Sequence, residues 1–144
     1  MLVSEVIAAK GRHVATLLPT DTVERALRLL AERRIGAVVI EDQWQKLAGI
    51  FSERDLVRLL AHEGPAVMQR ALDSVMTHNV ITCRAEDRID DILRLMTINK
   101  VRHVPVMEQG RLAGIVSIGD LVNHRLTEKQ QEAEVLLEIS RMRG

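Results

Sequence analysis

The sequence predicts an α/β fold of the α+β kind, with two tandem β-α-β-β-α units packed sheet to sheet in pseudo-twofold symmetry and a C-terminal helix. Three observations predict it. The 144-residue chain matches itself when it is shifted by 66 residues. Each copy has one segment of apolar residues at helical spacing and two short apolar runs around a polar turn. Each copy, at about sixty residues, is also too small to bury its apolar faces alone.

The repeat sets the expected organisation of the chain. Residues 14–16 align with 80–82, and residues 35–40 align with 101–106. After a one-residue difference in length, residues 47–56 align with 112–121, and both segments begin Leu-Ala-Gly-Ile. The lead-in 3–7 resembles 72–76, although the first copy carries extra residues, 8–12. We therefore expect a first unit over 1–66, a second over 67–126 and a final helix over 127–144.

The first copy reads as strand, helix, hairpin and helix. A short strand is expected at 14–16. Residues 22–33 have the apolar spacing of a helix, behind side chains that suit an N-cap, and Gly36 follows near the expected stop. The apolar runs 37–40 and 46–51 flank a polar segment and predict a hairpin, and a second helix is expected from Glu53.

The second copy predicts the same order: a strand near 80–82, a helix over 87–99, a hairpin of 104–107 and 111–116, and a helix from Ile118. Pro105 lacks an N–H for the ladder, so its strand is expected at an edge or near a bulge. The segment 61–66 is the expected linker. Residues 127–142 predict an amphipathic helix that packs on the body or on a partner.

Composition narrows the classes of function. Lys+Arg and Asp+Glu both total 20, and this zero net charge disfavours duplex nucleic acid as the main partner. Trp44 and Phe51 are the only aromatic residues, too few for the stacking platforms that bind single strands. No apolar run approaches the roughly 18 residues that span a bilayer. The N-terminal residues do not resemble a signal peptide, and a single cysteine cannot form an internal disulfide. We expect a cytoplasmic chain.

The most specific feature is a doubled segment, Gly-h-h-Ser-x-x-Asp, where h is apolar. It occurs at 49–55 and 114–120. In each copy a strand ends and a helix begins, so the serine is an N-cap and the aspartate holds the third helical position. A helix N-terminus suits a phosphate, and the aspartate suits a ribose diol. The same spacing is also a plain capping box, so the motif alone leaves both interpretations open.

These two segments, together with residues 35–39 and 101–106, resemble the paired cystathionine-β-synthase (CBS) module, also called a Bateman module, in its small stand-alone bacterial form. The resemblance implies a regulatory module without catalytic activity. Its cleft would hold an adenosine-containing ligand: AMP foremost, with ADP, ATP, NAD(H) or S-adenosylmethionine as others. Signalling would occur through a conformational or oligomeric change. The resemblance also implies a homodimer and an unidentified protein target.

The resemblance further implies two ligand sites, each shared between the copies. The first would use Ser52, Arg54, Asp55, Thr82, Arg84, Arg102, His103 and Pro105. The second would use Thr16, Leu18, Ala37, Val38, Val39, Ser117 and Asp120. The first site has three cationic groups for a phosphate and is the one expected to bind AMP. The second has Gly119 in place of Arg54, so it is expected to bind weakly, to bind a different ligand or to stay empty.

Other functions remain as alternatives. The motifs could only cap helices in a structural dimerisation module. An enzyme is disfavoured, because no nucleophile stands beside a base. A metal site is not expected, because His103 has no partner at ligand spacing. Cys83 is expected to be a small apolar residue, and exposure of Trp44 would mark a contact with a partner.

Overall fold

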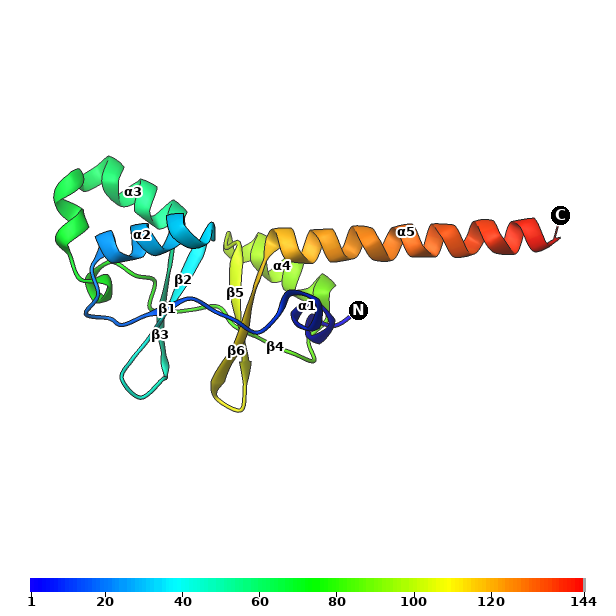
Figure 1. Ribbon diagram of the computed structural model, residues 1–144, viewed down its shortest axis with the longest axis horizontal. Helices are drawn as coiled ribbons and strands as arrows, with labels where there is room; N and C mark the ends of the chain where they lie inside the picture. Colours follow the sequence, from blue (N-terminus) through cyan, green and yellow to red (C-terminus); the bar gives the residue numbers. More distant parts are fainter. Residues whose placement is uncertain (144) are drawn as a thin grey trace.

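Two three-stranded sheets, each with its helices, lie side by side in the computed structural model, which describes residues 1–143 (Figure 1). The first sheet has the order β1-β2-β3, with β1 Thr16–Leu17, β2 Ala37–Glu41 and β3 Leu47–Ser52. The second has the order β4-β5-β6, with β4 Cys83–Arg84, β5 His103–Glu108 and β6 Arg111–Ser117. In each sheet the first pair is parallel and the second antiparallel. The predicted tandem β-α-β-β-α architecture is confirmed.

The first helices of the two units have the same length and end in the same way, although only the first has a side-chain N-cap. These helices are α2 Val23–Arg33 and α4 Ile89–Asn99. In α2 the Thr22 hydroxyl oxygen accepts a hydrogen bond from the Arg25 N–H at 3.2 Å, as an N-cap does. Both helices end on a left-handed residue, Arg34 with φ 53° and Lys100 with φ 55°. The C-cap of α2, Arg34, therefore lies two residues before Gly36.

The second helices follow the signature serines directly. α3 spans Glu53–Glu63, and the short 3-10 helices η1 Pro65–Gln69 and η2 Leu72–Ser74 come after it. α5 spans Ile118–Arg143. The predicted hairpins and helix starts therefore agree with the structure to within two residues. The short opening strands lie one to three residues later than expected, because β1 pairs with Val39 and Ile40 and β4 with Val106 and Met107.

Pro105 lies in the central strand of its sheet by order, yet it has a strand on one side only. It stands opposite Ile115 of β6, whereas β4 reaches only Val106 and Met107. The register shifts between those last two residues. The missing N–H is therefore at a locally open edge and one residue before an irregularity, as expected of a proline in a sheet.

Each unit's lead-in packs on the other unit. α1 Val3–Lys10 contributes Val3, Val6 and Ile7 to the core of the second unit. Leu72 and Met76, their counterparts in the repeat, belong to the core of the first unit. Residues of the first unit's core therefore extend to Met76, beyond the linker expected at 61–66. The intervening helix η1 packs on α2 and α3. The two units are held together by exchanged segments.

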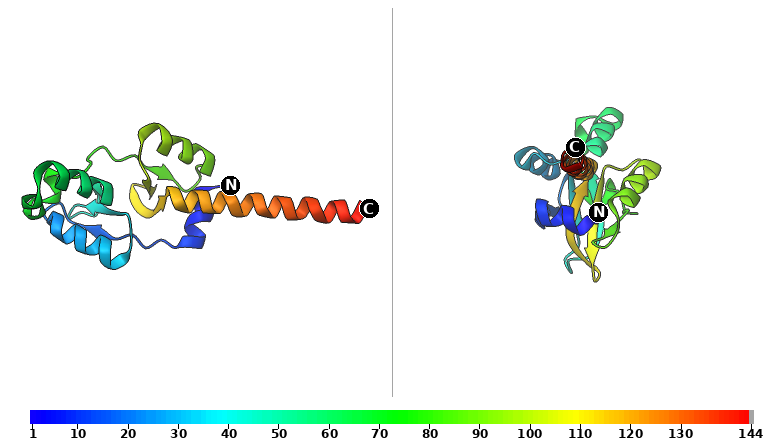
Figure 2. Two further views of the ribbon diagram at one scale, coloured as in Figure 1. Left: turned by 90° about the horizontal axis from the view of Figure 1, so that it is seen from above. Right: turned by 90° about the vertical axis from the view of Figure 1, so that its right-hand side faces the viewer.

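The helix expected over 127–144 is the continuation of α5 and not a separate element. Its first turns pack on α1 and α4, and Leu121 is fully buried. The remainder extends away from the body as a straight rod (Figures 1 and 2), and every described residue from 131 onward is exposed. Of the two places where this helix was expected to pack, the body is not one, because no described residue from 131 onward is buried; packing on a partner stays a prediction. Gly144 lies outside the described residues. Within residues 1–143 no helix is long and apolar enough to cross a membrane.

Candidate functional site

The first signature motif forms a complete capping box at the start of α3. The Asp55 N–H donates to the Ser52 Oγ at 3.2 Å, and the Ser52 N–H donates to the Asp55 Oδ2 at 2.9 Å. The Ser52 hydroxyl also donates to Oδ2, at 3.0 Å. Serine and aspartate therefore hold the helix positions that their spacing predicts. Among residues 1–143, Oδ1 of Asp55 has no hydrogen-bond partner, so one carboxylate oxygen remains for another donor.

A cleft of about 330 Å³ opens beside this helix start and is lined by both units. The first unit supplies the signature serine and aspartate, and the second supplies the residues before and at the start of β5. Five of the eight residues predicted for the first site lie here: Ser52, Arg54, Asp55, Arg102 and His103. The volume falls at the low end of the range of small-molecule sites.

Positive charge dominates the lining of this cleft. Arg54 and Arg58 extend from α3, while Lys100 and Arg102 come from the loop before β5. Within the part of the chain that the structure describes, none of these four side chains forms an ion pair. Several unpaired cations around a helix N-terminus favour a bound anion with more than one oxygen.

His103 sits in the cleft against Gly36 of the other unit. A Cβ at Gly36 would lie 2.7 Å from both Cε1 and Nε2 of the imidazole, so only a glycine permits this contact. Burial lowers the pKa of the His103 imidazole below its ordinary value, and the charge of Lys10 lowers it further. The carboxylates of Glu53 and Asp120 act in the opposite direction but do not cancel the shift. The ring is therefore kept neutral at physiological pH.

Three residues predicted for the first site lie elsewhere. Thr82 is exposed and does not line the cleft, and Pro105 is buried in β5. Arg84 pairs with Glu86 at 2.8 Å and lines a separate hollow at the end of the second hairpin. The cleft wall is formed by earlier residues, Thr77, Asn79, Val80 and Ile81, because β4 begins at Cys83 and not at 80. Had the strand been predicted three residues later, at 83, the residues just before it would have been predicted to line the cleft.

Sequence reasoning also missed several lining residues. Arg58 is one helical turn beyond Arg54, and that spacing could have indicated it. The apolar part of the lining consists of Ile50, Val80, Ile81 and Val101. Thr77 and Asn79 from the lead-in of the second unit, and Asn99 and Lys100 from the end of α4, complete the set together with Gly36 and Glu53.

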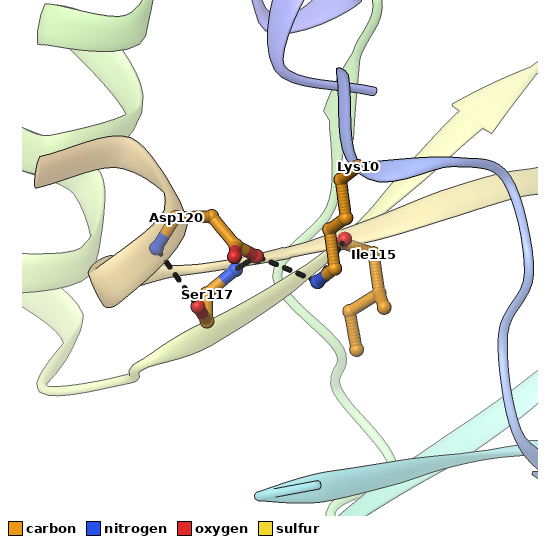
Figure 3. Close-up of polar contacts among 4 residues, drawn as sticks. All are labelled: Lys10, Ile115, Ser117 and Asp120. Carbon is orange, nitrogen blue, oxygen red and sulfur yellow. Dashed lines mark hydrogen bonds and ion pairs between the residues drawn. The ribbon is translucent and has the colours of Figure 1, made fainter. Parts of the chain in front are cut away.

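The second signature motif is also a capping box, and its aspartate is in addition hydrogen-bonded to a lysine. The Ser117 N–H donates to Asp120 Oδ2 at 2.8 Å, and the Asp120 N–H donates to the Ser117 Oγ at 3.0 Å. The ammonium of Lys10 donates to the same Oδ2 at 2.6 Å and to the Ile115 carbonyl at 3.0 Å (Figure 3). Partial burial raises the pKa of the Asp120 carboxyl, yet the hydrogen bonds from Lys10 and Ser117 outweigh it and leave the pKa low.

The other residues predicted for the second site fall into two groups, one at an open hollow and one in the core. Thr16 and Leu18 line an open hollow with the end of β2 and the first hairpin turn. Ala37, Val38 and Val39 are core residues with at most 6% of their surface exposed. The first site is thus a cleft assembled from both units, whereas the second motif is engaged by a side chain of the chain itself.

Cys83 and Trp44 both lie outside the cleft. Cys83 is buried in the second core, and burial, with the nearby Asp87 carboxylate, raises the pKa of its thiol to about 12. It is therefore an inert apolar residue at neutral pH. Trp44 projects from the first hairpin turn with 71% of its surface exposed. Within residues 1–143, no three His, Cys, Asp or Glu side chains cluster as a metal site would require.

Fold and cleft together define a tandem-repeat module in which two small α+β units share one ligand-sized cleft at a helix N-terminus. The family model described as "CBS domain" matches the chain twice, over residues 3–62 and 72–127, and the chain belongs to the CBS-domain family. Proteins built from a pair of these domains are generally regulatory or sensor modules.

Relatives agree over most of the chain. The CBS domain-containing protein CBSX3, mitochondrial, from Arabidopsis thaliana is 31% identical over 142 residues, which are 93% of this chain and 69% of that protein. The crystal structure of the CBS-domain containing protein ATU1752 from Agrobacterium tumefaciens is 43% identical, with a TM-score of 0.84. That match covers 86% of this chain and 92% of the other.

Two similar structures contain ligands. The CBS domain protein PAE2072 from Pyrobaculum aerophilum, in complex with AMP, is 25% identical with a TM-score of 0.74; the match covers 83% of this chain and 89% of that chain. The CBS domain pair of protein MJ0100, in complex with 5′-methylthioadenosine and S-adenosylmethionine, is 25% identical with a TM-score of 0.77. It covers 90% of this chain and 98% of that one. All three ligands contain adenosine.

Proposed function

We propose that this protein is a regulatory module that binds an adenosine nucleotide, AMP foremost, in the cleft between its two CBS domains. One observation carries the proposal: Arg54, Arg58, Lys100 and Arg102 converge without ion pairs, within the described chain, on a cleft that also contains the start of α3. A cluster of cations that the protein leaves uncompensated costs stability through mutual repulsion, and a bound phosphate removes that cost.

The lining assigns a role to each part of a nucleotide. The phosphate lies among the arginines and Lys100. The free Oδ1 of Asp55 accepts a hydrogen bond from a ribose hydroxyl, while its Oδ2 continues to cap the helix. The aliphatic side chains of Ile50, Val80, Ile81 and Val101 enclose the adenine, since the lining contains no Phe, Tyr or Trp. The AMP complex of PAE2072 supports this class of ligand.

The ligand would act by bridging the two units. The cleft takes residues from α3 on one side and from the loop before β5 on the other, so a bound nucleotide couples their positions. A homodimer and a protein target complete the proposal. Exposed apolar residues on the outer helix faces are the candidate contacts: Val57 of α3, Ile98 of α4, and Val122 and Leu126 of α5. ADP, ATP and NAD(H) remain competing ligands, as does S-adenosylmethionine.

Calorimetric titration tests the binding. AMP, ATP, NADH and S-adenosylmethionine are titrated separately against the parent chain, with light scattering before and after each. We expect AMP to bind and Arg54→Ala to weaken it by about tenfold or more, the loss of one charge-assisted hydrogen bond. Arg94→Ala is the matched control, because Arg94 is an exposed arginine on α4 that does not line the cleft.

A second pair of variants tests the aspartate. Asp55→Ala should abolish measurable AMP binding, whereas Asp91→Ala, at the third position of α4, should leave it intact. Both remove a carboxylate from a first helical turn, so a shared loss of binding would indicate an effect on helix stability and not on the ligand. Failure of all four ligands to bind at millimolar concentration would refute the proposal and favour a purely structural module.

A further inference from the structure

Lys10 makes a contact that breaks the symmetry of the two units. It is the last residue of α1, and its ammonium carries three protons. One is donated to Asp120 Oδ2 at 2.6 Å and another to the Ile115 carbonyl at 3.0 Å (Figure 3). About a third of the lysine side chain and a quarter of the aspartate side chain remain exposed, so the pair is partly shielded from solvent.

The equivalent place in the first unit has no such cation. There Ile50, the counterpart of Ile115, exchanges backbone hydrogen bonds with Thr77, at 3.0 and 3.1 Å. Within residues 1–143 the Asp55 side chain is hydrogen-bonded only to Ser52 and forms no ion pair. The difference arises from the lead-ins. The one before β4 has a three-residue helical turn and continues as extended chain, whereas α1 continues for eight residues and brings a lysine to the carbonyl.

In the first unit the position equivalent to Lys10 and Asp120 belongs to the cleft described above, because Ile50, Asp55 and Thr77 all line it. In the second unit a charged ammonium holds the equivalent carbonyl and the equivalent carboxylate, whereas in the first unit the carbonyl accepts from a backbone N–H and the carboxylate forms no ion pair within residues 1–143. Within residues 1–143, Oδ1 of Asp120 accepts no hydrogen bond, so a ribose hydroxyl would bind there beside the ammonium, on a carboxylate whose charge Lys10 already balances. Gly119 offers the phosphate no side chain in place of Arg54.

We propose that Lys10 closes the second signature position to nucleotides, so that the protein binds one nucleotide per chain although its sequence carries the binding motif twice. This inference rests on the proposed function for its ligand. Lys10 sets the stoichiometry because it supplies, from within the chain, the positive partner of Asp120.

The test is the stoichiometry of AMP and of ATP binding, measured by calorimetry on the full chain and on Lys10→Met. Methionine keeps the apolar stem and removes the ammonium. The parent is expected to bind one nucleotide per chain and Lys10→Met two, with the additional molecule lost again in Lys10→Met/Asp120→Ala. Lys46→Met is the matched control, because Lys46 is exposed in the first hairpin and forms no ion pair within residues 1–143. Lys10→Ala repeats the test with a shorter side chain, and melting curves verify folding.

The outcomes separate the two proposals. One nucleotide per chain in both the parent and Lys10→Met would overturn the closure. Two in the parent and one in Lys10→Met would make Lys10 a ligand contact and also overturn it. A parent that binds nothing, with Lys10→Met/Asp55→Ala binding one molecule, would refute the first-site function and support the closure. Binding to neither chain would refute both.

Discussion

Gly36 of the first unit and His103 of the second are in direct contact, so close that a Cβ on Gly36 would stand 2.7 Å from the imidazole. Both residues line the cleft. The contact joins the loop before β2 to the start of β5, and it fixes the ring at the junction of the two units. A methyl group added at Gly36 therefore tests whether the two units are in contact at this point of the cleft.

Gly36→Ala should destabilise the protein by about 1–2 kcal/mol, since the added methyl forces the imidazole out of its place. The φ of Gly36 is ordinary, so the cost comes from the contact and not from the backbone. Chemical denaturation measures it. Gly119→Ala is the control, because its added Cβ meets only the Ser117 hydroxyl at 3.6 Å. The double variant Gly36→Ala/His103→Ala should be less destabilised than the two single costs together; additive costs would contradict the contact.

Stability should also depend on pH through His103. Its folded pKa lies below that of the unfolded chain, so the unfolded state binds more protons and stability rises with pH. The contribution is fully present above the unfolded pKa of about 6.5 and is lost as the pH falls below it. The charged groups that act on the ring are Lys10, Arg102, Glu53 and Asp120. Urea melts between pH 5 and 8 should show a shallower dependence for His103→Gln than for the parent. Equal slopes would contradict the assignment.

The exchange of lead-ins gives a second steric prediction. A Cβ on Gly114 would lie 2.7 Å from the Cδ1 of Ile7, and one on Gly49 would lie 2.5 Å from the sulfur of Met76. Gly114→Ala should therefore destabilise the second unit by about 1–3 kcal/mol. Ile7→Val removes the clashing carbon and alone costs about 0.5–1.5 kcal/mol. Combined, the two changes should cost less than their sum in denaturant melts. Strict additivity would show that α1 does not pack there in solution.

Much of this architecture could be predicted from the repeat, and its failures have a physical cause. The apolar periodicity and the serine caps depend on neighbours within a few residues, so the start of α3 at Glu53, capped by Ser52, was predicted correctly. The Lys10–Asp120 pair joins positions 110 residues apart and involves a segment without a counterpart in the repeat. The cleft wall at 77–81 depends on which residues of β4 pair with β5. Long-range register, unlike local capping, leaves no mark in the spacing of residue types.

The last prediction concerns the distal part of α5, which continues beyond the body of the protein. Ending the chain after Gln130 removes a segment in which every described residue is exposed, so the melting temperature of the body should change by less than about 2 °C. Leu121→Ala, a buried change in the same helix, should cost about 2–5 kcal/mol and serves as the contrast. Calorimetry over a range of chain concentrations measures both. A large, concentration-dependent loss in the shortened chain would contradict the prediction, because it would show that the distal helix is stabilised by packing on another copy.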